Sequence, residues 1–287
     1  MRFVRGTIVA LLLATVSPAF AAATDRGDYV SIDVGGTFIK ATRFSRDGRA
    51  LKALRIPTPD NRDPDAIIAA LKRVFATVRG SAKVAKLAVG MPGPVDGTER
   101  VMGAPNLDDA AWKNGGQGID LQGRLARELE VPTIVVENDA VMASHDRSLL
   151  GSSTAKQTKL WITLGTGFGA VLKKGPAHLG TELAHHPWRL GKGNRLYTYE
   201  QDLGDAALRA GGIKRWLTHL EKALFLLDKT FGPRQILIAG GNAKHLADPR
   251  VLGRFRVADK IVLGSHETGT KGGYHMLRKA RPPRRSK

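Results

Sequence analysis

The sequence predicts an α/β protein made of two similar lobes around a central cleft. Each half of the chain opens on a strand, a glycine-rich turn and a second strand, and helices follow in both halves. Between the halves, the small polar segment 151–157 has the composition of a hinge. We therefore expect an N-terminal lobe over 24–150 and a C-terminal lobe over 151–280.

The first half alternates short apolar runs with amphipathic segments. The elements predicted there are, in order, strands at 29–33, 38–44 and 50–56, a helix from Pro64, a strand at 87–90, a helix at 121–130, a strand at 133–136 and a helix from about Asp139 to Gly151. Asp63 before Pro64 is typical of a helix start, and Gly80 is typical of a helix end. An Asp-Gly pair at 47–48 indicates a hairpin between the second and third strands.

The second half repeats this pattern beyond the hinge. It predicts strands at 160–164 and 170–173, an amphipathic helix at 213–227 and a strand at 236–239. The helix is the strongest of these predictions, because its apolar residues recur every three or four positions. The matching starts of the two halves support a repeated architecture.

The charge balance is strongly basic, with 45 Lys and Arg against 26 Asp and Glu and a formal net charge of +19. Such an excess attracts polyanions such as nucleic acid, anionic lipid or polyphosphate, although it can also be a solubility adaptation. The last residues, 281–287, read as a basic tail. The chain contains no cysteine, which excludes disulfides, thiol catalysis and thiolate-bound zinc.

The N-terminus has the pattern of an export signal. Arg2 and Arg5 precede an apolar stretch at 8–16, and Ala19-Phe20-Ala21 follows the small-x-small cleavage pattern. A cleaved signal peptide over 1–21 predicts a periplasmic or secreted protein. The alternative is a misassigned start codon upstream of a cytoplasmic protein.

Three glycine-rich turns follow predicted strands, at 33–37, 164–169 and 239–242. Glycine lacks a Cβ, so such turns let the backbone approach a phosphate closely, and amide and threonine groups can donate to its oxygens. Neither the Walker A spacing nor a glycine-rich motif opening a helix is present, which excludes the P-loop and Rossmann classes.

Seven motifs in order over about 29–247 resemble the ROK family (repressor, open reading frame, kinase) of sugar kinases. They are DVGGT at 33–37, GMPGPV at 90–95, PNL at 105–107, END at 137–139, TLGTGFG at 163–169, ELAHH at 182–186 and IAGGNAKHL at 238–246. The sequence is most similar to the polyphosphate glucokinase branch. This resemblance implies the two-lobed actin/hexokinase-like (ribonuclease H-like) fold with a central cleft.

The resemblance also implies a catalytic residue, Asp139. A sugar hydroxyl has a high pKa, so its attack on a phosphoryl group needs a carboxylate to accept the proton. From the residues alone, Asp139 at a strand-to-helix junction is more readily explained as a helix N-cap.

Further site residues follow from the same motifs. The implied hexose-binding residues are Asn106, Asn138, Glu182, His185 and Glu200, whose amide, carboxylate and imidazole groups suit sugar hydroxyls. The implied phosphate-donor residues are Asp33, Gly35, Gly36, Thr37, Lys40, Gly165, Thr166, Gly167, Gly240 and Gly241. Asp33 is also expected to orient Mg²⁺ through water, whereas no zinc is expected, because the three-cysteine cluster of zinc-binding relatives is missing.

Together these features predict a glucokinase-type phosphotransferase that uses polyphosphate, ATP or both to phosphorylate the 6-hydroxyl of glucose. The alternative is an exported, non-catalytic sugar- or polyanion-binding protein. Mannose or another hexose stays open as the acceptor, and a homodimer stays open as the assembly. We expect no DNA partner, because no DNA-reading element is recognisable. The run His186–Arg189 matches no motif, and Gly272-Gly273 is the candidate for the family's late glycine pair.

Overall fold

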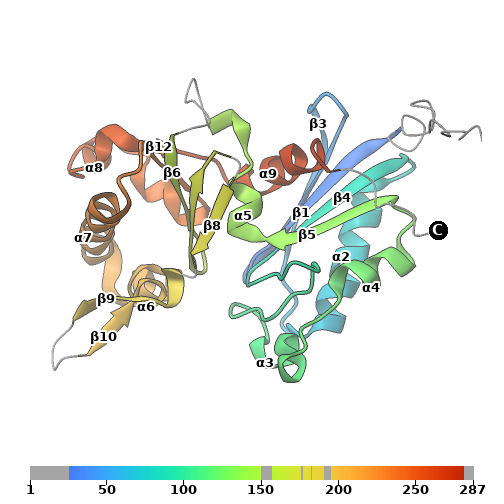
Figure 1. Ribbon diagram of the computed structural model, residues 1–287, viewed down its shortest axis with the longest axis horizontal. Coiled ribbons are helices and arrows are strands. Elements are labelled where there is room, and N and C mark those ends of the chain that lie inside the picture. The colour runs from blue at the N-terminus through green and yellow to red at the C-terminus, as the bar shows by residue number, and fades with distance from the viewer. Residues whose placement is uncertain (1–25, 150–156, 176, 182, 191–194, 281–287) are drawn as a thin grey trace, which may run out of the picture.

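The structure is a computed structural model that describes residues 26–149, 157–175, 177–181, 183–190 and 195–280. The predicted signal peptide, the basic tail and nearly all of the predicted hinge lie outside the described residues. Within the described ranges, no helix has both the length and the apolar character needed to cross a membrane. Figure 1 shows two lobes side by side, each built on one β-sheet.

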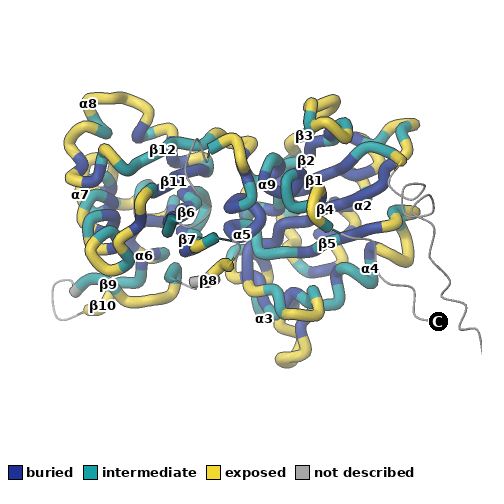
Figure 2. Tube along the Cα trace, turned by 45° about the horizontal axis from the view of Figure 1, so that its top comes forward, coloured by how far each residue is buried: buried dark blue, intermediate teal, exposed yellow. Residues whose placement is uncertain are grey.

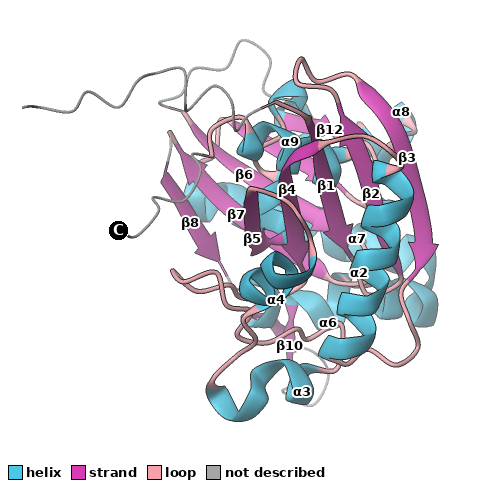
Figure 3. Cartoon of the chain, turned by 90° about the vertical axis from the view of Figure 1, so that its right-hand side faces the viewer, coloured by secondary structure: helices cyan, strands magenta, loops and turns pink. Residues whose placement is uncertain are grey.

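The first lobe contains a five-stranded mixed sheet in the order β3-β2-β1-β4-β5. Its strands are β1 (Asp28–Val34), β2 (Phe38–Phe44), β3 (Ala50–Pro57), β4 (Val84–Met91) and β5 (Thr133–Asn138). β1, β2 and β3 each run antiparallel to the next, whereas β4 and β5 run parallel to β1. The helices α2 (Pro64–Arg79) and α4 (Leu121–Glu128) cover one face, and the short α3 (Asp109–Lys113) lies at the end of the lobe (Figure 3).

The second lobe repeats this topology. Its sheet has the order β12-β11-β6-β7-β8, which read from β8 is three antiparallel strands followed by two strands parallel to β6. The strands are β6 (Thr158–Leu164), β7 (Phe168–Lys174), β8 (Ala177–Thr181), β11 (Gln235–Ala239) and β12 (Ile261–Leu263). Both sheets therefore have the same order and directions, which confirms the predicted repeat.

The predicted boundaries of helix α2 are confirmed by its caps. The Asp63 carboxylate accepts the N–H of Ala66, Pro64 occupies the first turn, and Gly80 ends the helix at a positive φ of 57°. The apolar face of α2 is buried against the first sheet, in the same core as Val30 and Ile32 of β1. Local chemistry and burial therefore agree along this segment.

Each lobe sends its last helix across to the sheet of the other lobe. α5 (Asp139–Ala143) follows β5, yet its Ala140 and Val141 pack on Trp161 of the second sheet. α9 (Thr268–Leu277) follows β12, yet its buried side chains pack on the first sheet. The C-terminal helix thus belongs to the core of the N-terminal lobe, although its place in the sequence assigned it to the C-terminal one. Figures 1 and 2 show α5 and α9 between the sheets, with α5 largely buried.

The late glycine pair is needed where these two helices meet. A Cβ on Gly272 would lie 2.1 Å from the backbone oxygen of Met142 in α5, and one on Gly273 would lie 2.0 Å from Oγ of Ser31 in β1. Neither position has room for a side chain. The pair therefore lets α9 approach α5 and the first sheet at backbone contact distance.

Two helices differ from their predicted lengths. The helix expected from Asp139 to Gly151 ends at Ala143, because Ser144 closes the turn through its hydroxyl to the Val141 carbonyl and the chain then continues in a short 3-10 turn at Arg147–Leu149. The helix predicted at 213–227 is longer and runs as α7 from Asp205 to Phe231, with a break at Gly212, where φ is 72°. The remaining elements are α6 (Tyr199–Leu203), α8 (Pro249–Leu252) and the hairpin of β9 (Pro187–Leu190) and β10 (Leu196–Thr198).

Candidate active site

A pocket of about 530 Å³ lies between the two lobes. Its walls come from the ends of β1, β4 and β5 in the first lobe and from β6, β7, β11 and the start of α9 in the second. Every predicted site residue that the structure describes lines it, which brings together Asp33, Gly35, Gly36, Thr37, Lys40, Asn106, Asn138, Asp139, Gly165, Thr166, Gly167, His185, Glu200, Gly240 and Gly241. The remaining one, Glu182, lies outside the described residues.

The first two glycine-rich turns meet across the pocket. The hydroxyls of Thr37 and Thr166 are 2.8 Å apart and share a hydrogen bond between the lobes. A Cβ on Gly36 would lie 3.0 Å from the backbone oxygen of Asn106 and 3.1 Å from Thr166, so only a glycine fits this contact comfortably. The first and second glycine-rich turns are therefore in direct contact across the pocket.

The third turn is held against the second. Gly240 has a φ of 101°, and a Cβ there would lie 2.3 Å from the backbone oxygen of Leu164. The buried Asn242 donates from Nδ2 to the Gly165 carbonyl at 3.1 Å and to the Asp205 carboxylate at 3.3 Å. These contacts fix three backbone turns around one space, as the close approach of a phosphate chain requires.

Cationic and anionic groups occupy the donor side of the pocket. Lys40 lies opposite Asp33 in the β1–β2 register and donates to its carboxylate at 3.1 Å. Asp33 also lies against the start of α9, where a Cβ on Gly269 would be 2.5 Å from its Oδ2. Arg55 and Lys244 line the same pocket, and the Arg55 guanidinium stacks 3.5 Å above the Phe38 ring. The site therefore has more basic groups for an anionic donor than the motifs alone indicated.

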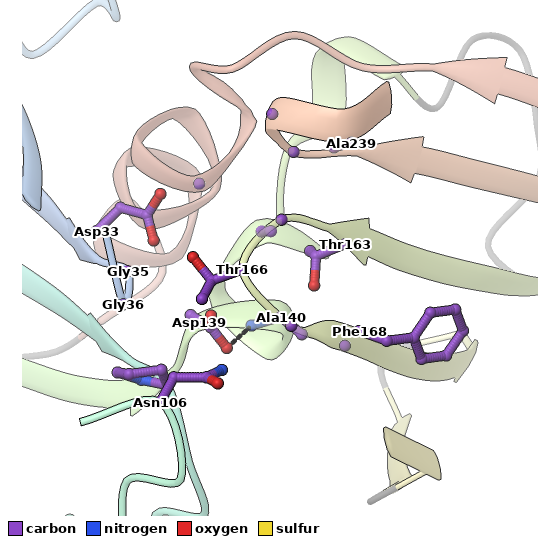
Figure 4. A pocket seen from close by; sticks show the side chains of 18 of the residues that line it. Asp33, Gly35, Gly36, Asn106, Asp139, Ala140, Thr163, Thr166, Phe168 and Ala239 are labelled. Atoms are coloured by element: carbon purple, nitrogen blue, oxygen red, sulfur yellow. Dashed lines mark hydrogen bonds between the residues drawn. The ribbon is translucent and has the colours of Figure 1, made fainter. Parts of the chain in front are cut away.

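Asn138, not Asp139, is the N-cap of α5. The Asn138 Oδ1 accepts the N–H groups of Ala140 and Val141 at 3.0 Å each, and its Nδ2 donates to the Gly93 carbonyl at 3.0 Å. Asp139 is the first helical residue, and its Oδ1 accepts the Ala140 N–H at 2.7 Å. Figure 4 shows the Asp139 carboxylate in the space between Asn106 and Thr166.

The predicted hexose residues form a second group around Gly167. A Cβ at Gly167 would lie 2.8 Å from the Asn106 Nδ2 and 2.8 Å from both oxygens of Glu200, so an amide of one lobe and a carboxylate of the other converge there. Glu200 also accepts the Phe168 N–H at 2.6 Å. Burial raises the pKa of Glu200, which the Phe168 amide and nearby His185 oppose.

The run His186–Arg189, which matched no motif, has a structural role behind this group. Arg189 in β9 donates two hydrogen bonds to the Asp202 carboxylate, at 2.7 and 2.8 Å. Asp202 lies two residues after Glu200 in α6 and is only 2% exposed. His219 adds a third contact at 3.0 Å, and Trp188 stacks on Tyr199 with ring centres 5.5 Å apart. The β9–β10 hairpin thus anchors the helix that carries Glu200.

Sequence reasoning missed several residues of the pocket. Glu137 lines it beside Asn138, and burial raises its pKa. Asn242 and Lys244 belong to the motif IAGGNAKHL, which could have identified them as pocket residues. Arg55 and His266 belong to no recognised motif and come from a strand and a loop far apart in the sequence. Topology alone brings them to the pocket.

Comparisons with known proteins agree with the geometry. The sequence model of the ROK family matches residues 29–186. A glucokinase of Streptomyces coelicolor is 28% identical over 163 residues, or 54% of this chain and 48% of the relative. A glucokinase of Halalkalibacterium halodurans is 30% identical over 219 residues, or 69% of this chain and 63% of the relative. The chain therefore spans about half of the first relative and less than two thirds of the second.

A solved structure resembles the whole fold. The crystal structure of an inorganic polyphosphate/ATP-glucomannokinase from an Arthrobacter species matches with a TM-score of 0.73 at 25% sequence identity. The match covers 88% of this chain and 98% of that protein, so it includes both lobes and the pocket between them.

Proposed function

Since the chain belongs to the ROK family, we propose that it is a hexose kinase of the glucokinase type. In this proposal it transfers a phosphoryl group to the 6-hydroxyl of glucose. The observation that carries the proposal is the place of Asp139. Its carboxylate lies in the pocket between the lobes, and Asn138 takes over the N-cap, so the cap alone does not account for Asp139.

Asp139 is the proposed base. A carboxylate in hydrogen-bond reach of the acceptor hydroxyl takes its proton as the bond to phosphorus forms. The Asp139 carboxylate lies beside Thr166 of the second glycine-rich turn, and one of its oxygens accepts the Ala140 N–H (Figure 4). A hydroxyl held between Asp139 and this turn would face both the base and the donor.

The hexose is proposed to bind beside Gly167, where Asn106, Glu200 and His185 lie together. Amide, carboxylate and imidazole groups offer the donors and acceptors that sugar hydroxyls need. Asn138 has most of its hydrogen-bonding capacity occupied by the N-cap and the Gly93 carbonyl. We therefore assign Asn138 one remaining N–H for the sugar and a main role in holding α5 and Asp139.

For the donor we propose polyphosphate, with ATP as a second substrate. Lys40, Arg55 and Lys244 line the pocket, and the chain carries a net charge of +19. The resemblance to a polyphosphate/ATP-glucomannokinase also supports this choice. Mg²⁺ commonly binds proteins through one or two carboxylates together with substrate phosphates, which fits the carboxylate of Asp33 at the first donor turn. Bound there through water, the ion would neutralise charge on the donor oxygens.

A coupled assay with purified protein tests the proposal. Glucose and mannose are each supplied with polyphosphate or ATP in the presence of Mg²⁺, and formation of the sugar 6-phosphate is followed. We expect glucose phosphorylation with polyphosphate to exceed that with ATP. Turnover with ATP alone would overturn the donor assignment, and no turnover with any pair would favour a non-catalytic sugar- or polyanion-binding protein.

A further inference from the structure

Three basic side chains stand side by side on the second sheet, at the end away from the glycine-rich turns. Lys159 of β6 is directly opposite Lys173 of β7, which is directly opposite His178 of β8. Directly paired residues project from the same face of a sheet with their Cβ atoms about 5 Å apart. We name these three residues the basic row. Lys173 is five residues from Phe168 at the other end of β7, or about 17 Å along the strand, so the row is separate from the pocket.

Like charges placed directly opposite each other destabilise a sheet, so the basic row is costly by itself. More cations surround it. The charges that act on Lys173 come from Lys279, Lys159 and Arg147, and together with burial they lower the pKa of Lys173 to about 8. His145 packs edge-on against His178 with ring centres 4.9 Å apart. Burial lowers the pKa of both imidazoles, that of His145 to about 3, so the two rings are neutral at pH 7 and the charge of the site comes from the lysines and Arg147. No carboxylate among the described residues forms an ion pair with Lys159, Lys173, Arg147 or Lys279.

Closing a helix end explains only part of this charge. Lys173 donates to the Ser144 carbonyl at the end of α5, at 3.0 Å. The first lobe uses one lysine for the same purpose, because Lys86 donates to the carbonyls of Leu277 and Ala280 at the end of α9. A single lysine is therefore sufficient for that role. Lys159 is only 5% exposed as a residue, and its side chain forms no hydrogen bond or ion pair with any described residue. Its ammonium is not sealed from solvent, so an anion from outside can reach it.

The neighbouring sequence supplies no compensating charge either. The stretches 150–156 and 281–287, which follow Leu149 and Ala280 in the chain, contain no Asp or Glu. At the surface, Arg147, His178 and Lys279 are exposed beside the more buried lysines. The arrangement combines pre-positioned cations, a partly desolvated floor and an open rim, which is what a multiply charged anion requires.

We propose that the basic row, with Arg147 and Lys279 at its rim, binds phosphate oxyanions, and that its occupant is a stretch of polyphosphate chain. The choice of polyphosphate rests on the proposed function, in which the same polymer is the phosphoryl donor. A second contact outside the pocket would raise the local concentration of the donor chain without taking part in the chemistry. Asp146 lies next to His145 in sequence, but it is buried against His275 at 3.8 Å and binds Ser148, so it does not neutralise the row.

Lysine footprinting tests the site without depending on activity. A neutral amine reacts with an acylating reagent, so at pH 8 Lys173 is labelled readily and a bound anion slows its labelling. With tripolyphosphate at ten times its Kd, we expect labelling of Lys159 and Lys173 to slow about tenfold. The exposed Lys174, on the opposite face of β7, is the internal control and should label at an unchanged rate.

The competing anions distinguish the occupants. If sulfate at matched ionic strength slows the labelling of Lys159 and Lys173 equally, the protection is electrostatic screening, and the proposal is overturned. Equal protection by orthophosphate would overturn its assignment to a chain, and stronger protection by a single-stranded RNA would overturn its assignment to polyphosphate.

A variant confirms the location. Lys159→Gln with Lys173→Gln should bind one tripolyphosphate fewer than the wild type by calorimetry, whereas Lys174→Gln should bind the same number. In phosphate-free buffer the double variant loses a like-charge pair, which favours folding, and the Lys173 hydrogen bond to the Ser144 carbonyl, which opposes it, so circular dichroism and a melting curve establish first that it is folded. Unchanged stoichiometry in a folded double variant would refute the site. If the wild-type protein phosphorylates no sugar but the double variant still binds one tripolyphosphate fewer, the proposed function is refuted and the site is not.

Discussion

Replacing Arg189 with alanine removes the main partner of a buried carboxylate. The Asp202 side chain is 1% exposed and Arg189 is 22% exposed, and two hydrogen bonds of 2.7 and 2.8 Å join them. Breaking one side of a buried ion pair costs about 3–5 kcal/mol. Because His219 and Arg215 stay at 3.0 and 3.7 Å from the carboxylate, we expect the lower end, about 3 kcal/mol of unfolding free energy.

Urea denaturation followed by circular dichroism measures this loss. Arg195→Ala is the matched control, since Arg195 lies over the same Tyr197 ring at 4.9 Å, compared with 4.5 Å for Arg189, and has no carboxylate partner among the described residues. The control should lose no more than about 0.5 kcal/mol. Because Asp202 lies in the helix that carries Glu200, Arg189→Ala should also raise the KM for glucose about tenfold. Equal stability of the two variants would refute the anchoring role of the β9–β10 hairpin.

Three further predictions concern other contacts. Gly272→Ala places a Cβ 2.1 Å from the Met142 carbonyl oxygen, so it should lower the unfolding free energy by about 3 kcal/mol. Gly97→Ala is the control, because nothing lies within 4 Å of a Cβ at that position. Equal melting temperatures of the two variants would contradict the contact between α9 and α5. Glu200→Gln keeps an acceptor for the Phe168 N–H but loses the charge beside His185, and should raise the glucose KM about tenfold with an unchanged melting temperature; an unaltered KM would remove Glu200 from the sugar site. Burial and nearby cations lower the pKa of Lys173 to about 8, so the folded protein loses this proton before the unfolded chain does. The cost of the charge is full below pH 8 and shrinks as the pH rises. The melting temperature of Lys173→Gln relative to the wild type should therefore fall from pH 7 towards pH 10, on top of a constant loss of the hydrogen bond to Ser144, and a pH-independent difference would contradict it.

Local signals predicted the elements whose ends depend on local chemistry. Asp63, Pro64 and Gly80 bounded α2 correctly, because the cap bonds form within the segment itself. The glycine-rich turns and their opposition were also predictable, since a repeated motif in a repeated lobe implies a matching position.

Other features depend on contacts that no local pattern contains. α5 ends at Ala143 because Ser144 closes its last turn, whereas the sequence predicted a helix that continues to Gly151. The crossing of α9 to the first sheet requires knowledge of the partner surface, and only the glycine pair hinted at it. Both Asn138 and Asp139 are good caps by residue type, so the geometry was needed to decide between them.

The buried pair of Arg189 and Asp202 was also hidden in the sequence. The two residues are thirteen positions apart and belong to a hairpin and a short helix that pack only in the folded chain. The role of the run around Arg189 is accordingly structural, and it appears only when the aromatic stack of Trp188 and Tyr199 is seen beside it.

The most direct test of the central claim is the turnover of Asp139→Asn with glucose and the better donor. Because Asn138 supplies the N-cap of α5, the variant should keep the melting temperature and glucose affinity of the wild type. If Asp139 is the base, kcat should fall by a factor of about 10²–10⁴. A kcat within a few-fold of the wild type in a folded variant would contradict the account, because the hydroxyl proton would then have another acceptor.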